Sequence, residues 1–440
     1  MAECGEGALE RLKRYRWAVF AVLAVGYFFV YFHRMSVSVV GSDIVEEVGG
    51  TIGILSSVYF WTYTAMQIPC GLLTDRFGPR VVSTAFLVVA SIGSLMTSFG
   101  GSFWMMVLGK IMIAAGMAVV YVPLMKLVSV WFPKRDYAVL SGVVIAVGNV
   151  GAIAASGPLS LLAEAVGWRE VFLILGVITL LLAASCALVI RDHPRQKGLP
   201  SVEESEGIPV SSDDSAGRVP VLKGLRIVVS GGRRFWPCAL AYFLIYGSIM
   251  VFQGTWAIKY FNSVYGFALS AAWMITALGI GKILSTVAIG ALTTRGVITS
   301  KRSAMIYGTA AFAAVWAVIF LFAGRIDNYW FWFSVSFLFG FFGGFMTLTF
   351  AAIKEWYPIA IAGTAVSAAN IFLFLGASVG TTVSGWMIGT SYTLGNFSAV
   401  WGLMLAFAVV AVVLLLLFRE KSETDPVFGV EEVRRAEEDF

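Results

Sequence analysis

The chain has 440 residues, of which 59% are hydrophobic and 13% are charged, and its mean hydropathy is +0.84. One soluble core cannot hold that much apolar surface, so the composition excludes a soluble globular protein and predicts a protein embedded in a bilayer. The net charge of +5 does not indicate nucleic-acid binding, because Lys and Arg lie in short loops between apolar runs and form no continuous basic face.

Apolar runs of about 20 residues, the length that crosses a hydrocarbon core, recur along the chain. The first run follows a basic cluster, as a secretory signal does, but it is too long and lacks a small-residue cleavage site, so we predict an uncleaved helix. Six runs lie near 17–40, 51–74, 81–99, 103–131, 137–162 and 168–190. Six more lie near 236–260, 268–294, 303–323, 328–354, 360–389 and 395–418.

Between the two sets, residues 191–235 are rich in Ser, Glu, Asp, Gly and Arg, a composition too hydrophilic to bury and typical of a flexible linker. The sequence therefore predicts an all-α polytopic membrane protein with twelve helices in two six-helix bundles, residues 1–190 and 236–418. Residues 419–440 form a tail. Because the basic loops alternate with loops that are acidic or almost uncharged, both termini, the linker and the tail are predicted to be cytoplasmic.

A compact charged turn, Gly-Leu-Leu-Thr-Asp-Arg-Phe-Gly-Pro-Arg, joins the second and third runs at residues 71–80. It resembles the motif between the second and third helices of the major facilitator superfamily, whose members are solute transporters with twelve helices in two halves. The matching positions are Gly71, Asp75, Arg76, Gly78 and Arg80. The resemblance implies that they act as a conformational switch. Pro79 departs from the usual basic residue. Asp75 is then expected to face the positive N-terminal end of a helix in the other half.

Two short segments occur twice. Gly71-Leu-Leu-Thr-Asp-Arg returns as Gly290-Ala-Leu-Thr-Thr-Arg, and Trp131-Phe-Pro returns as Trp356-Tyr-Pro. Parallel repeats of this kind are typical of transporters that rock one bundle against the other around a site near the bilayer midplane. Thr294 replaces the acid of the first copy, so any charge contact is expected to be weaker in the second half.

Further stretches resemble the superfamily. Lys110 followed by Gly116 is similar to its fourth helix, and Gly167-Trp168-Arg169 is similar to the start of its sixth. The fifth run contains Gly148, Gly151 and Gly157-Pro158, which partly resemble the glycine-proline motif of antiporters. Close helix packing accounts for these glycines equally well.

Four basic residues lie well inside predicted helices: Arg34, Lys110, Lys126 and Lys282. A charge at that depth costs about 2.5 to 3.5 kcal/mol on insertion scales, so each needs a partner. All Asp and Glu residues fall in tails, loops or helix ends. The sequence therefore predicts that an anionic substrate neutralises these cations, with Lys110 expected instead to hold a packing network.

The first helix carries the strongest site prediction. Tyr27, Tyr31, Arg34 and Ser38 follow one another at steps of four, three and four, which puts them on one helix face. The segment from Tyr31 to Ser36 resembles the first helix of bacterial organic-anion and organophosphate carriers, in which the arginine contacts substrate. The planar guanidinium suits bidentate binding of a carboxylate or phosphate.

Two lysines extend the resemblance to these carriers. Lys126, shortly before Trp131-Phe-Pro, matches a basic residue of their anion site or its entrance. Met250 stands where phosphate-ester carriers place a second arginine, which favours a carboxylate substrate, and Lys282 is a candidate for the missing cation. On the seventh run, Gln253, Trp256 and Tyr260 fall on one helix face and are candidate contacts. Further candidate contacts, which bonds between helices would explain equally well, are Tyr59, Tyr63, Gln67, Asn149 and Asn370.

An enzyme is disfavoured, because the only histidines are His33 and His193 and no carboxylate pair, nucleophile motif or metal-ligand cluster lies within the helices. His33 is predicted to be a packing residue. The cysteines, Cys4, Cys70, Cys186 and Cys238, match no zinc spacing and lie near predicted cytoplasmic ends, so neither disulfide, metal nor cofactor is expected.

The prediction is a monomeric secondary transporter of a small organic anion, most simply a carboxylate, in a bacterial inner membrane. The alternatives left open are a proton-coupled carrier of a neutral sugar, a drug-efflux antiporter, and a membrane receptor or scaffold without transport. The sequence does not distinguish uniport, exchange and proton-linked symport, and it does not name the anion.

Overall fold

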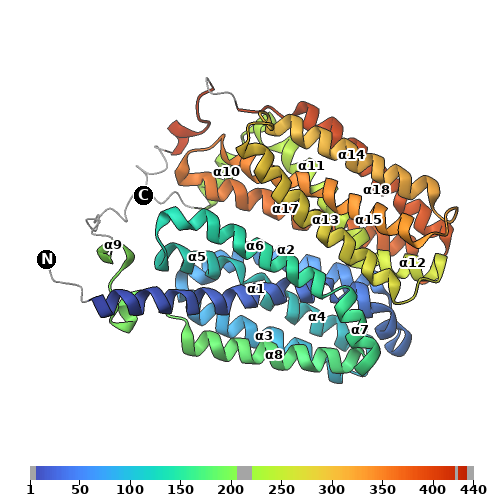
Figure 1. The fold of residues 1–440 in the computed structure, drawn as a ribbon, viewed down its shortest axis with the longest axis horizontal. Helices are drawn as coiled ribbons and strands as arrows, with labels where there is room; N and C mark the ends of the chain where they lie inside the picture. The colour runs from blue at the N-terminus through green and yellow to red at the C-terminus, as the bar shows by residue number, and fades with distance from the viewer. Residues whose placement is uncertain (1–5, 206–220, 422–424, 434–440) are drawn as a thin grey trace. The chain divides into compact units, whose positions relative to one another are not determined.

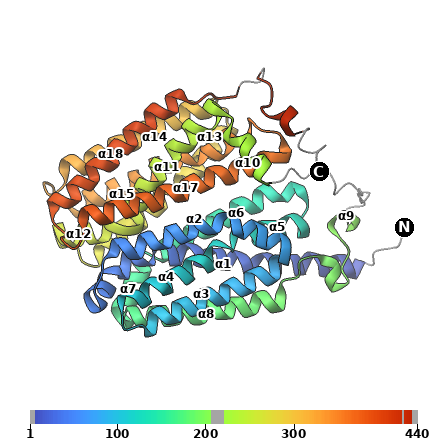
Figure 2. The same cartoon turned by 180° about the vertical axis from the view of Figure 1, so that it is seen from behind.

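The computed structural model describes residues 6–205, 221–421 and 425–433, and these residues form helices and connecting turns with no strand among them. Part of the predicted linker, part of the predicted tail and Cys4 therefore lie outside the described residues. The chain divides into two compact units, residues 1–212 and 213–440. Figures 1 and 2 show the helices of each unit running alongside one another.

The first unit contains helices α1 to α9. The bounds are α1 Glu6–Val48, α2 Ile52–Phe77, α3 Pro79–Phe99, α4 Phe103–Ala118, α5 Tyr121–Trp131, α6 Tyr137–Ala154, α7 Gly157–Val166, α8 Trp168–Val189 and α9 Val202–Ser205. Two short 3-10 helices, Lys134–Asp136 and Pro194–Lys197, complete the described part of this unit.

The second unit contains helices α10 to α18. The bounds are α10 Val221–Val229, α11 Trp236–Val251, α12 Ala257–Tyr265, α13 Ser270–Thr294, α14 Lys301–Phe322, α15 Tyr329–Gly343, α16 Leu348–Lys354, α17 Ile359–Ile388 and α18 Leu394–Leu417. A π-helix, Phe252–Trp256, joins α11 to α12, and 3-10 helices occupy Gly232–Arg234 and Gly344–Thr347.

The described helices account for the predicted membrane spans. Ten helical segments are long and apolar enough to cross a membrane, and the bent pair α6–α7 makes an eleventh. The remaining predicted span is α2, which has 26 residues and is about 39 Å long at 1.5 Å per residue. This helix is less apolar than the other spans, and its polar side chains include Ser56, Ser57, Tyr59 and Tyr63, which are all buried inside the protein. The chain is a polytopic, all-α membrane protein.

Three helix pairings of the first unit recur in the second. In the first unit α1 packs on α6, α2 on α4, and α3 on α8, which lie side by side in Figures 1 and 2. In the second unit α11 packs on α17, α13 on α15, and α14 on α18. The two short sequence repeats therefore belong to two units that are built to the same plan.

Equivalent tryptophans make equivalent bonds in the two units. Trp131, at the end of α5, donates its indole N–H to the carbonyl of Arg191 at 2.9 Å. Trp356, just after α16, donates to the carbonyl of Arg419 at 2.9 Å. Each acceptor lies just beyond the last long helix of its unit, α8 or α18. The repeated tryptophan thus ties the end of the fourth span to the end of the sixth in both units.

Glycines allow the closest helix contacts. A methyl group added to Gly151 of α6 would lie 2.2 Å from the carbonyl oxygen of Phe28 in α1, and one added to Gly376 of α17 would lie 2.0 Å from that of Phe243 in α11. Both pairs join the first and fifth spans of their unit. The glycines of the partial antiporter motif therefore have a packing role in the first unit, where the helix also bends by 43° between α6 and α7, just before Gly157-Pro158.

Arg169 bonds several segments to one another at the end of the first unit where α1 terminates. Arg169, at the start of α8, lies 2.6 Å from the carboxylate of Glu47 and donates to the carbonyls of Ser98 and Gly100 at 2.7 and 2.8 Å. Trp168 donates its indole N–H to the same carboxylate at 2.9 Å. The Trp-Arg pair of the motif near residue 168 thus connects α1, α3 and α8.

The expectation that all of residues 191–235 are too hydrophilic to bury is wrong at α10. Ile227 and Val228 of this helix are buried, and α10 packs on α17. The phenol of Tyr357 donates to the carbonyl of Val228 at 2.9 Å, and burial raises the pKa of that phenol, so it stays a hydrogen-bond donor. Average composition over the stretch concealed a short amphipathic helix, because polar neighbours diluted its apolar face.

Two glycines of α6 provide a matched test of this packing. We expect Gly151→Ala to lower the melting temperature of the purified protein, because overpacking of this kind costs about 1 to 3 kcal/mol. Gly142→Ala, at a position with no atom within 4 Å of the added methyl group, should be neutral or stabilising by up to about 1 kcal/mol, since alanine is the better helix former. Equal melting temperatures for the two variants would contradict the assigned contact.

Candidate functional site

Arg34 lies in a cluster of tyrosines on the first unit. Only 4% of its surface is exposed, and its guanidinium carbon is 4.5 Å from the ring centroid of Tyr31 and 4.9 Å from that of Tyr63. Tyr31 also contacts Tyr27 at 5.3 Å, and Tyr63 contacts Tyr59 at 6.1 Å in a stacked arrangement. These residues come from α1 and α2 only, so two adjacent helices build a cationic site with an aromatic wall.

Neighbouring helices hold the tyrosine wall in place. Tyr121 of α5 packs on Tyr27 with ring centroids 5.2 Å apart. A methyl group at Gly148 of α6 would lie 2.8 Å from Tyr31 and 2.9 Å from Tyr27, so this glycine makes room for both rings. Ser38, the last member of the predicted stripe, is buried and donates to the carbonyl of Met35 at 2.7 Å. Asn149, next to Gly148, is 7% exposed.

The opposite face of α1 carries a separate buried polar cluster. His33 is fully buried, and its Nε2 is 3.5 Å from the hydroxyl of Thr179 in α8. Lys110 of α4 is also fully buried; its Nζ donates to the hydroxyl of Ser36 at 3.1 Å and lies 4.8 Å from the ring centroid of Phe172. These contacts join α1, α4 and α8, which agrees with the packing roles predicted for His33 and Lys110.

The switch motif is bonded within its own unit. Gly78 has a φ of +82°, which glycine adopts without strain, and a methyl group there would lie 2.5 Å from a carboxylate oxygen of Asp192. The same carboxylate accepts the backbone N–H of Arg80 at 2.7 Å, and the Arg80 guanidinium donates to the carbonyl of Ala187 at 2.7 and 3.0 Å. The turn is thereby anchored to the end of α8. Gly71 has open space among the described residues where a side chain would begin.

The expectation that Lys126 has no acidic partner in the protein is wrong. Its Nζ lies 2.7 Å from the carboxylate of Asp75 and 3.2 Å from the carbonyl of Thr74. Thr74 is eleven residues beyond Tyr63 on α2, about 16 Å along the helix at 1.5 Å per residue. The structure therefore does not bring Lys126 to the tyrosine cluster. Sequence reasoning missed the pair because α5 and α2 meet only in the folded unit.

Neither member of this ion pair occurs in the second copy of the repeat. Thr294 replaces Asp75, and its hydroxyl donates to the carbonyl of Gly290 in its own helix at 2.9 Å. Counting back from the repeated tryptophans, Ala351 stands at the place of Lys126. The ion pair thus distinguishes the first unit from the second.

In the second unit the predicted contacts of the seventh span fall on a distorted turn. Gln253 lies in the π-helix and is 4% exposed. Trp256, at the end of that turn, is fully buried and donates its indole N–H to the hydroxyl of Ser384 in α17 at 2.9 Å. Tyr260 is fully buried as well and lies 3.1 Å from the hydroxyl of Tyr265. In this conformation Trp256 and Tyr260 pack the unit, and Gln253 is buried in the π-turn, which periodicity does not reveal.

Lys282 also lies beside aromatic rings. Its Nζ is 6.0 Å from the ring centroid of Tyr246 in α11, and that ring contacts Phe374 of α17 at 5.9 Å. Asn370 lies one turn before Phe374 on α17 and is half-buried. The second unit therefore has its own cation beside a tyrosine. No cluster of three or more His, Cys, Asp or Glu side chains suited to a metal occurs in the part of the chain that the structure describes.

The profile of the Major Facilitator Superfamily matches residues 23–295 and residues 238–436. The chain belongs to this superfamily. The fold class and the family resemblance predicted from residues 71–80 are thereby confirmed.

Two curated members of the superfamily are similar over the same share of the chain. The probable sulfoacetate transporter SauU of Cupriavidus necator is 26% identical over 272 residues, which are 61% of this chain and 62% of that protein. The hexuronate transporter of Escherichia coli K12 is 25% identical over 275 residues, 60% of this chain and 63% of that protein. The alignments thus span less than two thirds of these relatives.

A solved superfamily structure shows the same fold. A bacterial homologue of the human lysosomal transporter Spinster, crystallised inward-facing and unoccupied, aligns with a TM-score of 0.67 and 16% identity over 92% of this chain and 96% of that one. At this identity the likeness concerns the fold alone. With its apolar helices and superfamily membership, the chain is a multi-pass protein of a bacterial membrane.

A double-mutant cycle tests the ion pair between α2 and α5. Because the Asp75 and Lys126 side chains are 74% and 35% exposed, we expect a coupling energy of no more than about 1 kcal/mol. Asp75→Asn and Lys126→Met should each lower the melting temperature slightly, and the double variant should be less destabilised than the sum. Thr294→Ala serves as the matched control and should change little. Strict additivity would show that the pair carries no interaction.

Proposed function

We propose that this protein is a secondary transporter that carries a small organic anion bearing a carboxylate. The observation that carries the proposal is the Arg34 site, a nearly buried guanidinium between the rings of Tyr31 and Tyr63 on two membrane helices. Both relatives described above are named as carriers of organic acids, sulfoacetate and hexuronate. Such solutes all carry a negative charge, and a fixed cation inside the membrane is a suitable binding partner for that charge.

The geometry of the site suits a planar anion. The guanidinium carbon lies 4.5 and 4.9 Å from the ring centroids of two tyrosines, and a guanidinium binds a carboxylate with two parallel N–H bonds in its own plane. Tyr59 and Tyr63 are proposed as hydroxyl contacts and Asn149 as an amide contact from α6. Because Arg34 is only 4% exposed, the solute reaches it only when neighbouring side chains or helices move, as alternating access requires.

Further contacts are proposed within the second unit, from the sequence. They are Lys282, which lies beside Tyr246, and the amide side chains of Gln253 and Asn370. Trp256 takes part only in a conformation that uncovers it. Lys126 contributes long-range potential at most, since its ammonium is engaged by Asp75.

The remaining features of the proposal concern orientation and energy coupling. Charge distribution in the loops supports cytoplasmic termini in the inner membrane. The protein is proposed to act as a monomer and without a cofactor, and transport is driven by the gradient of the solute or of protons. The motif formed by Gly71, Asp75, Arg76, Gly78 and Arg80 is proposed to control the change of access.

Substitution of Arg34 tests the site. We expect Arg34→Ala to abolish binding and counterflow of organic acids in proteoliposomes, and Arg34→Lys to weaken binding at least about tenfold, because an ammonium cannot make the two parallel bonds of a guanidinium. The solutes to compare are mono- and dicarboxylates, sugar acids, sulfonates and phosphate esters. Arg295→Lys, at the exposed end of α13, is the matched control. Near-normal affinity in folded Arg34→Ala would refute the assignment.

Ionic strength separates the two lysines. Neutralising Lys282 should weaken anion binding more at about 0.01 M salt than at about 0.15 M, because the screening length falls from about 30 to about 8 Å. Lys126→Gln should have a smaller effect at both, since Asp75 already offsets its charge. Affinity is measured by equilibrium binding on the purified variants. Equal effects of the two substitutions would contradict the different environments assigned to them.

A further inference from the structure

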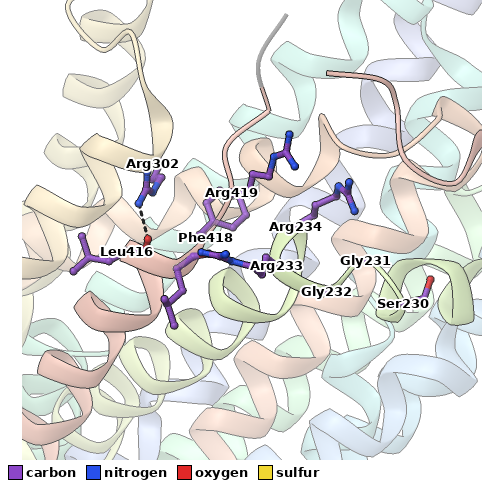
Figure 3. A pocket seen from close by; sticks show the side chains of 10 residues that line it. Ser230, Gly231, Gly232, Arg233, Arg234, Arg302, Leu416, Phe418 and Arg419 are labelled. Atoms are coloured by element: carbon purple, nitrogen blue, oxygen red, sulfur yellow. Dashed lines mark hydrogen bonds between the residues drawn. The ribbon is translucent and has the colours of Figure 1, made fainter. Parts of the chain in front are cut away.

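Four arginines surround a cavity at one end of the second unit. The cavity has a volume of about 480 Å³ and is lined by Arg233, Arg234, Arg302 and Arg419, by the turn at Gly231–Gly232 and by the carbonyl end of α18. In Figure 3 Arg302 and Arg233 lie beside the last turn of α18, and the side chains of Arg234 and Arg419 extend away from it. The transport proposal uses none of these residues.

Part of this positive charge caps α18. Arg302 donates to the carbonyls of Leu415 and Leu416 at 3.3 and 2.5 Å, and Arg233 donates to that of Leu417 at 3.2 Å. The last carbonyls of a helix lack intrahelical donors, so these contacts are structural. A guanidinium has five N–H donors, however, and the bonds described use two from Arg302 and one from Arg233.

The guanidinium groups of the other two arginines, Arg234 and Arg419, pack against aromatic rings. The guanidinium carbon of Arg234 lies 4.6 Å from the ring centroid of Phe428 and 5.1 Å from that of Trp356, and that of Arg419 lies 5.7 Å from Trp356. The Nε of Arg234 is buried and has no hydrogen-bond partner among the described residues. Aromatic contacts fix the planes of these cations without consuming their donors.

Nearby acids offset only part of the charge. Asp425 accepts a bond from Arg419 at 2.6 Å. Glu420 is engaged at the start of α14 by the backbone N–H of Lys301 and the hydroxyl of Ser300, and Glu355 pairs with Lys301 at 2.8 Å. Among the described residues, no carboxylate lines the cavity itself. Within that part of the chain, four guanidinium groups with one directly bonded acid form a site with an excess of positive charge.

The surface beside the cavity is apolar. Leu416 and Leu417, which line it, are 51% and 48% exposed, and Val413 one turn earlier on α18 is 52% exposed. α18 is one of the helices apolar enough to cross a membrane, and it ends at this cavity. A ligand with an anionic head and hydrocarbon chains would place its head among the arginines and its chains along α18.

We propose that this cavity binds the phosphate group of an anionic phospholipid at the membrane surface. A phosphate diester offers acceptor oxygens to the remaining guanidinium donors, and its acyl chains cover the exposed leucines and valine of α18. A free phosphate compound shares the head-group chemistry but has nothing to place on the apolar surface. The lipid is therefore the expected occupant.

Native mass spectrometry and melting curves of the full-length protein in a neutral detergent test the proposal. Phosphatidylglycerol should be retained and should raise the melting temperature, whereas phosphatidylcholine and inorganic phosphate at the same concentration should do neither. Arg234→Gln with Arg419→Gln should weaken retention of phosphatidylglycerol about tenfold or more, as loss of charge-assisted phosphate bonds requires. Arg295→Gln, outside the cavity, should retain the lipid normally.

The alternatives give different results. Equal retention of phosphatidylcholine, or a full effect from inorganic phosphate, would overturn the assignment of an anionic lipid. Unchanged retention in the double glutamine variant would show that Arg234 and Arg419 serve only to pack against the aromatic rings. If the double variant does not fold, Arg234→Lys keeps the charge but loses the planar fork, and it should still weaken retention severalfold. Normal retention in Arg234→Lys would then count against the site.

Discussion

A polar or charged group inside hydrocarbon must be satisfied by the protein itself, and the arrangement of this chain depends on that constraint. The buried cations meet it in different ways. Arg34 lies between tyrosine rings, Lys110 bonds a serine across a helix interface, and Lys282 lies beside Tyr246. Of these, only the Arg34 cluster combines a planar cation with several hydroxyl groups on adjacent helices. That combination makes it the candidate site rather than another packing contact.

Close packing supplies the rigidity that such a site needs. In lipid, helices gain little from burying apolar surface against each other, so small residues that let backbones approach become the main packing device. Gly148 and Gly151 bring α6 against α1 at the level of Tyr27 to Tyr31, and thereby fix the tyrosine wall. The equivalent contact between α17 and α11, at Gly376, shows that the second unit uses the same device. A carrier that moves its helices as rigid groups requires packing of this kind within each group.

The first unit's ion pair and the second unit's arginine-lined cavity make the two repeats chemically different. Asp75 with Lys126 joins α2 to α5, whereas Thr294 and Ala351 stand at the corresponding positions. Arginines bond the last carbonyls of α18, as Arg80 and Arg191 do at the end of α8, but the arginine-lined cavity is described at α18. Packing sets the helix plan that the two units share, and a few side chains at the helix ends make the units chemically different.

The sequence by itself determined the number and order of the spans, the two-part organisation, the family and the polar stripe of the first helix, because hydropathy and helical period are local properties of the chain. Tertiary structure alone decided which polar groups meet. Lys126 forms an ion pair with Asp75, Tyr121 packs on Tyr27, and Trp256 donates a hydrogen bond to Ser384. The members of each pair are far apart in the sequence, so helical periodicity does not predict these contacts. The sequence likewise did not reveal the π-turn at Gln253 or the buried face of α10. Hydropathy averaged over a window of residues hides a feature that is only one helical turn long. Partners of buried charges are set by how helices pack, and packing is a property of the folded unit.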